Sequence, residues 1–368
     1  MARVASTVEA EGCVGFRRRI ALSTLSGRSV QIDEIRAGSS RPGLCEYEAN
    51  FLRLVESLSN GCRVQINDTG TRLRFRPGVV TGGSHVHVCN TARSVGYYIE
   101  GILPLLPFAK STTTILFKGA ATHDAEGADF CVDTLRDVTL PLLRRFGLEG
   151  ALELNLRRRA SPPTGGGEVI LTCKPVRALR PFQLVDPGFV KRVRGVAYAT
   201  RVSPQTCNRM VSAAREIFNG FLPDVYVATD AVRGKLCGKD PGFGVQLTAE
   251  TTTGCVLSAE CVATQGVLPE ELGRRTAELL CEEIAKGGCV DASHQPLCCL
   301  MMAITPEDVS KVRVGQLSAP AIIALRDIRA FLGTVFKITP QIDRATGCGT
   351  VTLACLGSGL SNVSKAVC

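Results

Sequence analysis

Tryptophan is missing from this chain of 368 residues, and aromatic side chains make up only 5% of it. Proteins that hold single-stranded nucleic acid without sequence preference stack successive bases on aromatic rings. So low an aromatic content argues against a binding surface that relies mainly on such stacking. Histidine is scarce as well, and the four histidines are His85, His87, His123 and His294. Any histidine chemistry must therefore use one of these four positions.

Regular cysteine spacing is also absent, although cysteine itself is abundant. None of the 17 cysteines belongs to a Cys-x-x-Cys pair, and only Cys298 and Cys299 are adjacent. Zinc sites and disulfide frameworks show regular spacing, so we expect free thiols that serve as small buried hydrophobes in a reducing compartment. His85 and His87 would share one face of an extended segment, but a closed metal site needs about four ligands. We therefore predict no metal.

Neither a secretory leader nor an apolar run of about 18 residues is found, so we expect an intracellular protein with no membrane association. A dense run of lysine and arginine is missing too, so no basic signal separates the nucleus from the cytoplasm. The formal net charge is +9. This moderate basic excess suits a phosphate-rich partner, and it equally suits ordinary solubility.

Apolar periodicity predicts alternating helices and strands in the first half of the chain. A helix is expected over residues 44–60, where apolar residues recur at helical spacing and Gly61 follows as a C-cap. Strands are expected over residues 28–35, 63–66 and 71–75.

Two later stretches repeat one pattern. Leu103-Pro104-Leu105-Leu106 precedes a predicted strand over residues 112–117, and Leu140-Pro141-Leu142-Leu143 precedes one over 151–156. Helix followed by strand, repeated at this spacing, indicates an α/β protein with layered helices and sheets. Proline bends or ends a helix, so we expect both helices to be interrupted there.

The character of the chain changes after Lys174-Pro175. Residues 183–284 hold their own series of strand, helix, strand, strand and helix, with helices predicted over 204–218 and 269–285. We interpret residues 183–284 as a small inserted α/β domain. The large domain would then comprise residues 1–182, with its first two units, and residues 285–368, with the third.

Several short blocks occur in a fixed order along almost the whole chain. They are Ile35-Arg36-Ala37-Gly38 with Arg41-Pro42-Gly43-Leu44, Phe75-Arg76-Pro77-Gly78, Phe117-Lys118-Gly119, Gly165-Gly166-Gly167-Glu168-Val169, Ala249-Glu250-Thr251-Thr252-Thr253-Gly254-Cys255 and Gly287-Gly288-Cys289-Val290-Asp291. The ordered set resembles the RNA 3′-terminal phosphate cyclase superfamily. The resemblance implies three repeated units, each a four-stranded sheet plus two helices, with the small domain inserted before the third.

The chain departs from the cyclase pattern where the chemistry would occur. The cyclases carry AMP on a histidine, but the matching stretch, residues 314–329, contains none, and Leu317 or Ser318 cannot act as nucleophile without an activating base. Their glycine-rich opening is reduced here to Glu11-Gly12-Cys13-Val14-Gly15, and their Asp-Gln pair reads His294-Gln295. We therefore predict a protein without catalytic residues or cofactor, whose task is binding.

Two arginine triplets are candidate sites for anions or RNA. Arg17-Arg18-Arg19 follows the reduced glycine loop. On a strand, Arg17 and Arg19 would share one face and could hold a phosphate, while the alternative is a solvated edge strand. Arg157-Arg158-Arg159 closes a predicted strand, so Arg157 and Arg159 are candidates for RNA backbone contact or for a protective charged strand end.

A third charged cluster, Arg326-Asp327-Ile328-Arg329, ends an apolar helical stretch. Arg326 and Arg329 lie three residues apart and would share a helix face. We predict that Arg326, Asp327 and Arg329 bind an acidic partner or RNA phosphate, the alternative being a solvated helix end with an internal ion pair. For His294 beside Cys298 we expect a satisfied histidine next to a buried thiol.

The runs Leu22-Ser23-Thr24-Leu25-Ser26-Gly27 and Asp308-Val309-Ser310-Lys311-Val312 point to a branch of the family that has the cyclase fold without the cyclase nucleophile. The resemblance to this branch implies a nucleolar, non-catalytic ribosome biogenesis factor of the small-subunit processome. It would bind an assembly GTPase, pre-rRNA and processome proteins during 18S rRNA maturation. The alternative is an endonuclease that cuts pre-rRNA at an early site, which would need acids, bases or metals at phosphodiester geometry.

Overall fold

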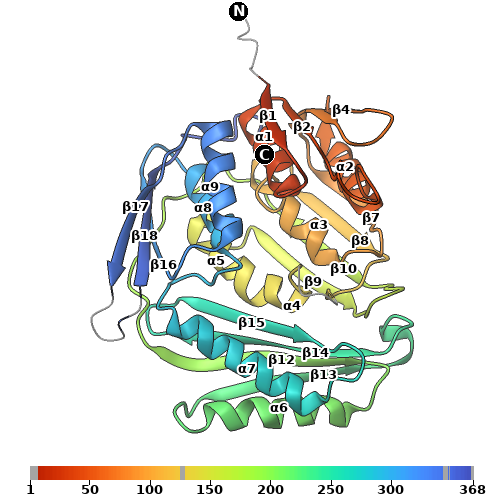
Figure 1. Cartoon of the computed structure of the whole chain (residues 1–368), viewed down its shortest axis with the longest axis vertical. Helices are drawn as coiled ribbons and strands as arrows, with labels where there is room; N and C mark the ends of the chain where they lie inside the picture. Colours follow the sequence, from red (N-terminus) through yellow and green to blue (C-terminus); the bar gives the residue numbers. More distant parts are fainter. Residues whose placement is uncertain (1–6, 125–128, 343–346, 348, 366–368) are drawn as a thin grey trace, which may run out of the picture.

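The computed structural model describes residues 7–124, 129–342, 347 and 349–365. Within these ranges the chain forms four four-stranded sheets, each accompanied by helices, and one two-stranded ribbon (Figure 1). The expected α/β architecture is therefore present. Among the described residues, no helix has the length and apolar character to cross a membrane.

The first sheet has the strand order β1-β2-β5-β4, in which β1 and β2 are parallel and the other neighbours antiparallel. Its inner face is apolar because alternate residues point to one side, so that Leu73 and Phe75 are fully buried. The elements of this unit are β1 (Val8–Glu11), α1 (Phe16–Ser26), β2 (Val30–Asp33), α2 (Glu46–Leu58), β4 (Arg63–Ile66) and β5 (Leu73–Arg76), with β3 (Ser59–Asn60) and β6 (Val79–Val80) as the ribbon.

The second sheet repeats this arrangement in the order β7-β8-β10-β9. Both proline-containing helices are interrupted as expected. The first ends at Ile102, before Pro104, and the second changes to π-helical turns on either side of the short segment that holds Pro141. The elements are β7 (Gly83–Val88), α3 (Val95–Ile102), β8 (Thr113–Lys118), α4 (Val132–Thr134), α5 (Leu140–Leu143), β9 (Leu152–Arg158) and β10 (Glu168–Cys173).

The third sheet has the same pattern again, in the order β11-β16-β18-β17, with β11 parallel to β16. Its elements are β11 (Gln183–Leu184), α8 (Gln295–Ala303), β16 (Val309–Val314), α9 (Ala319–Leu332), β17 (Lys337–Ile342) and β18 (Gly349–Leu356). Each of the three sheets thus begins with a parallel pair whose two strands are joined by a crossover through a helix.

The fourth sheet, in the order β13-β12-β14-β15, lies in the chain between β11 and β16. It therefore interrupts the third unit after its first strand, whereas the resemblance implied an insertion before that unit. The physical reason is that β11 pairs with β16, so the whole inserted sheet forms part of one parallel crossover. Its elements are β12 (Val190–Thr200), α6 (Pro204–Phe218), β13 (Val225–Val232), β14 (Gly242–Thr251), β15 (Val256–Val262) and α7 (Pro269–Ala285).

Separate hydrophobic cores hold the three units and the inserted sheet. One buried cluster includes Phe51, Phe117, Phe146 and Val312, from all three units. The inserted sheet packs its own cluster, with Phe218 and other side chains, against α6 and α7. The described cysteines are free thiols, most of them buried, which agrees with their expected role as small hydrophobes. Because the two cores are separate, the contact between the units and the inserted sheet can be made by polar side chains.

Candidate functional site

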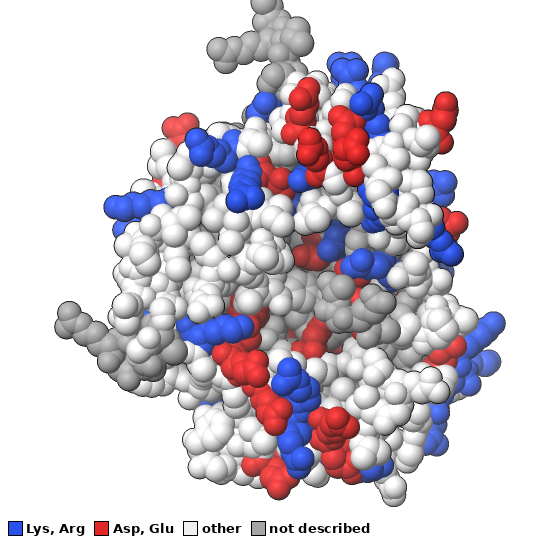
Figure 2. Space-filling view, in the orientation of Figure 1, with Lys and Arg blue, Asp and Glu red and all other residues white. Residues whose placement is uncertain are grey.

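A cleft of about 660 Å³ lies where the first two units, α8 and the inserted sheet meet. Its walls include the start of α1, side chains of α2 and α3, β15 and the outer turns of α7. Figure 2 shows the molecule hollowed near its centre, with charged side chains of both signs around the opening. Because loop Glu11–Gly15 and the start of α8 both border it, the cleft is where the sequence placed the reduced cyclase motifs.

The loop between β1 and α1 reaches this cleft with Cys13 and Gly15. Gly15 caps α1 with a φ of 75°, and a Cβ there would lie 2.7 Å from the Arg18 guanidinium and 3.0 Å from the Asp327 carboxylate. Glycine is therefore needed at this position both for the left-handed backbone and for the close approach.

The arginine triplet lies in the first turn of helix α1, so the arrangement considered for a strand does not apply. On a helix the three side chains point in different directions, and Arg17 and Arg19 do not share a face. Arg17 enters the cleft, whereas Arg19 is buried, donating to the carbonyls of Glu11 and Gly12 at 2.8 and 3.0 Å and to Asp327 at 3.2 Å. Arg19 therefore fixes the loop and is not exposed to an anion in the cleft.

A cluster of arginine and tyrosine side chains forms one wall of the cleft. The Arg17 and Arg93 guanidinium carbons lie 4.2 and 4.8 Å from the centre of the Tyr97 ring, and Tyr47 packs edge-on against that ring. Arginine over a tyrosine face is a favourable cation–π arrangement. Burial raises the pKa of Tyr47 to about 12, so the phenol stays protonated and can donate.

Carboxylates neutralise each arginine of this wall. Arg36 makes a bidentate pair with Glu48, with both N–O distances at 2.7 Å, and Arg93 makes one with Asp129 at 2.5 and 2.6 Å. Arg17 pairs with Glu100 at 3.0 Å. Burial raises the pKa of Asp129, although both neighbouring arginines act against this.

The cleft as a whole is close to electrically neutral. Its described lining residues include five cations, Arg17, Arg18, Arg36, Arg93 and Lys286, and six carboxylates, Glu48, Glu100, Asp129, Glu260, Glu282 and Glu283. Glu260 accepts hydrogen bonds from the Cys131 backbone at 3.1 Å and from the Thr134 hydroxyl, and burial raises its pKa. Sequence reasoning singled out Arg17 alone among these residues, although Arg36 stood in the block Ile35-Arg36-Ala37-Gly38 that supported the resemblance.

His294 is buried beside the cleft and fully hydrogen-bonded. Its Nδ1 lies 2.7 Å from Asp291 and its Nε2 2.8 Å from the Thr139 hydroxyl, while its ring stacks on Phe130. Burial opposes protonation of His294, but the Asp291 carboxylate outweighs it and raises the histidine pKa. The Cys298 thiol is directed to Met302, so the expected satisfied histidine beside a buried thiol is confirmed.

The segment that the resemblance matches to the cyclase nucleophile is held by structural hydrogen bonds. Gln295 donates to the Gln316 carbonyl at 3.0 Å and accepts from the Ser318 backbone at 2.9 Å. The Ser318 hydroxyl accepts from the Ala321 backbone at 3.3 Å and so caps α9, and Leu317 packs against the core. This hydroxyl is therefore engaged as the cap of α9.

The charged residues of the third cluster, Arg326, Asp327 and Arg329, lie on different sides of α9. Asp327 is only 8% exposed and pairs with Arg18 at 3.0 Å and Arg19 at 3.2 Å, which contradicts the expectation that it binds a partner. Arg326 and Arg329 are exposed on the opposite side. Ile322, 40% exposed, lies one turn before Arg326 and adds apolar area to the same face.

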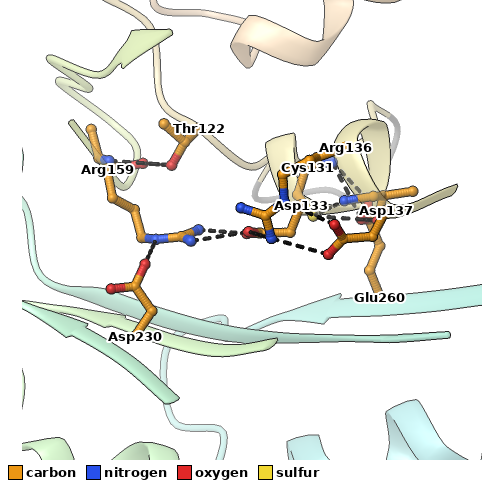
Figure 3. A network of polar contacts seen from close by, with 10 residues as sticks. Thr122, Cys131, Asp133, Arg136, Asp137, Arg159, Asp230 and Glu260 are labelled. Carbon is orange, nitrogen blue, oxygen red and sulfur yellow. Dashed lines mark hydrogen bonds and ion pairs between the residues drawn. The ribbon is translucent and has the colours of Figure 1, made fainter. Parts of the chain in front are cut away.

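The arginines at the end of β9 are likewise divided. Arg157 is exposed, whereas Arg159 is 3% exposed and pairs with Asp133 at 2.6 Å and Asp230 at 2.8 Å. Figure 3 shows Arg159 between these two carboxylates, one from the second unit and one from the inserted sheet. The expectation that Arg159 contacts RNA is therefore wrong, because its guanidinium joins the two parts of the molecule.

The histidines His85 and His87 do not form a metal site with other side chains. His85 approaches the Gly82 carbonyl at 3.1 Å, and His87 the Asn50 side chain at 3.0 Å. Across the described part of the chain, no three His, Cys, Asp or Glu side chains are grouped so that they could hold an ion.

Comparison with known proteins identifies related sequences along almost the entire chain. The family model described as RNA 3′-terminal phosphate cyclase matches residues 8–338. An "RNA 3′-terminal phosphate cyclase-like protein" of Homo sapiens is 48% identical over 373 residues, which cover 99% of each chain. A "probable RNA 3′-terminal phosphate cyclase-like protein" of Dictyostelium discoideum is 42% identical, covering 96% of this chain and 98% of its own. The "rRNA processing protein RCL1" of Saccharomyces cerevisiae is 37% identical, covering 97% of each.

Proposed function

This chain belongs to the RNA 3′-terminal phosphate cyclase family, in its cyclase-like branch, and from that membership we propose that it is a non-catalytic factor in rRNA processing. Relatives named for rRNA processing, at 37% and 39% identity over nearly the full length, support the process. In the finer form of the proposal, the protein acts in the nucleolus, within the small-subunit processome, in 18S rRNA maturation. There it binds pre-rRNA, processome proteins and an assembly GTPase.

The observation that carries the proposal is the hydrogen bonding and packing of residues 316–318, the segment next to α8. Covalent catalysis needs a nucleophile within reach of a base that activates it. Here Ser318 caps α9, Leu317 packs against the core and Gln295 bonds the backbone on either side of Leu317. Because these contacts give Ser318 and Leu317 structural roles, they support binding as the function.

For the assembly GTPase we propose the exposed face of α9, made of Ile322, Arg326 and Arg329. This α9 face combines an apolar side chain with two arginines that have no ion pair among the described residues. Arginine beside apolar area is typical of interface hot spots. Asp327 supports the face from behind, because its ion pairs with Arg18 and Arg19 fix α9 against α1.

Replacing Arg326 by alanine tests this surface. Truncation of a buried interfacial arginine costs on the order of 2–4 kcal/mol of binding free energy, so Arg326→Ala should weaken capture of the assembly GTPase at least about tenfold. The melting temperature should change little, because Arg326 is exposed. Titrated pull-downs with the purified GTPase measure the effect.

Two matched variants complete the experiment. Arg329→Ala should weaken capture less than Arg326→Ala, and Arg157→Ala, which removes an exposed arginine from a different unit, should leave it unchanged. If Arg326→Ala captures the GTPase as well as the parent does, the α9 face is not its docking site.

An endonuclease remains the second candidate, but the described residues favour it less. Asp327, the carboxylate that stood between two arginines in sequence, is committed to Arg18 and Arg19. In the cleft, Glu48 and Asp129 are each held in a bidentate pair with an arginine. A metal-assisted cut needs carboxylates that are free to bind ions, and these are not.

A further inference from the structure

The outer face of the first sheet carries arginines that form no ion pair with any carboxylate of the described residues. Leu73 and Phe75 of β5 point into the core, so Arg74 and Arg76 point outward and are exposed. On the neighbouring strand β4, Val64 packs inward and Arg63 is exposed. We call Arg63, Arg74 and Arg76 the arginine face.

Strand register brings two of these like charges together. Arg63 lies directly opposite Arg76 in the antiparallel β4–β5 pair, and Arg74 lies opposite Gln65. Directly opposed residues on such strands have Cβ atoms about 5 Å apart, and like charges in this position destabilise the sheet. The pairing of Arg63 with Arg76 therefore costs folding stability. A bound anionic ligand would offset this cost.

Carboxylates do not relieve this repulsion. Within the described ranges, none of the three arginines has an ion pair, although Arg72 on the same side pairs with Asp33. Glu56 lies near enough to help burial raise the pKa of Cys62 to about 11, yet it forms no ion pair with Arg63 or Arg76. The arginine face is therefore a site of uncompensated positive charge, unlike the nearly neutral central cleft.

A groove of about 400 Å³ runs beside Arg63 and Arg76, and none of its lining residues is shared with the cleft. Its other walls are mainly turns with glycine, at Gly27, Gly61 and Gly78. A Cβ added at Gly27 or Gly61 would meet nothing within 4 Å. Bare backbone of this kind lets a polymer chain approach closely.

We propose that the arginine face and its groove bind the phosphate backbone of RNA, a contact that rests on the proposed role in rRNA processing and lies outside the cleft. Guanidinium groups match phosphate oxygens in a bidentate fork, and an RNA phosphate between Arg63 and Arg76 would remove their mutual repulsion. Figure 2 shows basic side chains along the upper edge of the molecule near β4, with acidic side chains beside them towards β2.

A protein partner fits this surface less well than RNA does. The cores of protein interfaces are depleted in charge and enriched in aromatic residues. The groove lining includes two arginines and one exposed apolar side chain, Val79, and no aromatic ring. Phosphate contacts carry no sequence information, so we expect binding that tolerates many sequences and weakens with salt.

The double variant Arg63→Gln/Arg76→Gln of the full chain tests the proposal. Anisotropy titrations would use a labelled single-stranded RNA of about 20 nucleotides and a duplex of the same length, at several salt concentrations. We expect affinity at low salt to fall about tenfold, and the slope of log K against log salt to become less negative by about 1.4 for the single strand. The melting temperature should stay equal or rise, because the like-charge pair is removed.

The control is Arg274→Gln/Arg275→Gln. It changes the net charge by the same amount at exposed positions of α7, the helix that packs on the inserted sheet. Its RNA affinity should stay within about twofold of the parent, since only phosphate-contacting charges set the salt slope. Equal losses in both double variants would reduce the effect to bulk charge and overturn the proposal. Failure of the parent protein to bind either RNA at low salt would overturn it too.

Two further readouts distinguish this inference from binding of an acidic protein and from the proposed GTPase site. If the double variant keeps RNA binding but loses binding of a polyglutamate peptide, the arginine face takes an acidic protein and the RNA assignment is wrong. Capture of the assembly GTPase by the double variant should be unchanged. An inert arginine face together with loss of capture by Arg326→Ala would overturn only this inference and leave the proposed function in place.

Discussion

At the scale of single residues, identical side chains next to one another have different roles. Arg17 faces the cleft and contacts Tyr97 and Glu100, whereas Arg18 and Arg19 both pair with Asp327 on α9. A helix turns about 100° per residue, so Arg17 points into the cleft while Arg18 and Arg19 reach Asp327 from a different side of α1. Their charges in the first turn also oppose the helix dipole, which explains why each arginine is paired with a carboxylate.

Two buried histidines should give opposite pH dependences of stability. Asp291 raises the pKa of His294 despite its burial, so its contribution is fully present below the unfolded pKa of about 6.5 and is lost as pH rises through the folded value. Burial, with Arg159, lowers the pKa of His123 to about 3. The His123 contribution is fully present above the unfolded pKa of about 6.5. It is lost as pH falls from there towards the folded pKa of about 3.

Urea unfolding between about pH 4 and pH 9 checks this pair. Each histidine changes the slope of unfolding free energy by up to about 1.4 kcal/mol per pH unit. His294→Asn should flatten the decline on the alkaline side, and His123→Phe the decline on the acid side. Variants that keep the parent's slope on both sides would contradict the assignment.

At the scale of elements, ion pairs join parts of the chain that lie far apart in the sequence. Asp327 connects α9 to α1 through Arg18 and Arg19. The end of β9 connects the second unit to the inserted sheet, because Arg159 binds Asp133 on one side and Asp230 on the other (Figure 3). These contacts set how the walls of the cleft stand relative to one another.

Alanine at the two ends of one short run should therefore have very different effects. Arg159→Ala leaves the fully buried Asp133 carboxylate without its main partner, and breaking a buried pair in this way costs about 3–5 kcal/mol of folding stability. Arg157→Ala removes an exposed side chain and should stay within about 0.5 kcal/mol. Denaturant unfolding of both variants measures the difference.

Arg159→Lys refines that experiment, because lysine keeps the charge but cannot form the planar fork that binds two carboxylates. Its stability should fall between those of the parent and Arg159→Ala. Equal stability of Arg157→Ala and Arg159→Ala would show that the buried network does not hold the inserted sheet.

At the scale of the whole molecule, the fold of the cyclase family surrounds a cleft whose lining charges nearly cancel. Three units with one strand pattern surround the cleft, and the inserted sheet closes one side of it (Figure 1). The lining charges balance to within one unit, with five cations and six carboxylates. The uncompensated positive charge lies on surfaces elsewhere, at the arginine face and the α9 face.

The protein should form no covalent adduct with AMP. Residues 314–329 contain no histidine, and the hydroxyl of Ser318 is used as the cap of α9. After incubation with labelled ATP and Mg²⁺, denaturing gels should show no label on the protein, while an active cyclase of the family run in parallel is labelled. Acid-labile label at stoichiometric level on this protein would contradict the prediction.

The sequence by itself determined many of the regular elements and the lack of histidine in residues 314–329. The helices expected over residues 204–218 and 269–285 were found at those bounds, because a proline at the start of each helix marks its beginning in sequence. Helical spacing of the apolar residues in 44–60 likewise predicted α2, whose Phe51, Leu54 and Leu58 are buried. The absence of a nucleophilic histidine needs no structure, since it is a property of composition in one segment.

Tertiary structure alone decided which charged residues are free to bind. The sequence treated Arg17 and Arg19, Arg157 and Arg159, and Arg326 and Asp327 as equivalent members of their clusters, and the structure buries one of each pair. Burial depends on partners far away in the chain: Arg18 and Asp327 are 309 residues apart, and Arg159 and Asp230 are 71 apart. Local patterns report the geometry of a helix or strand, whereas the pairing of charges is fixed only when distant elements pack together.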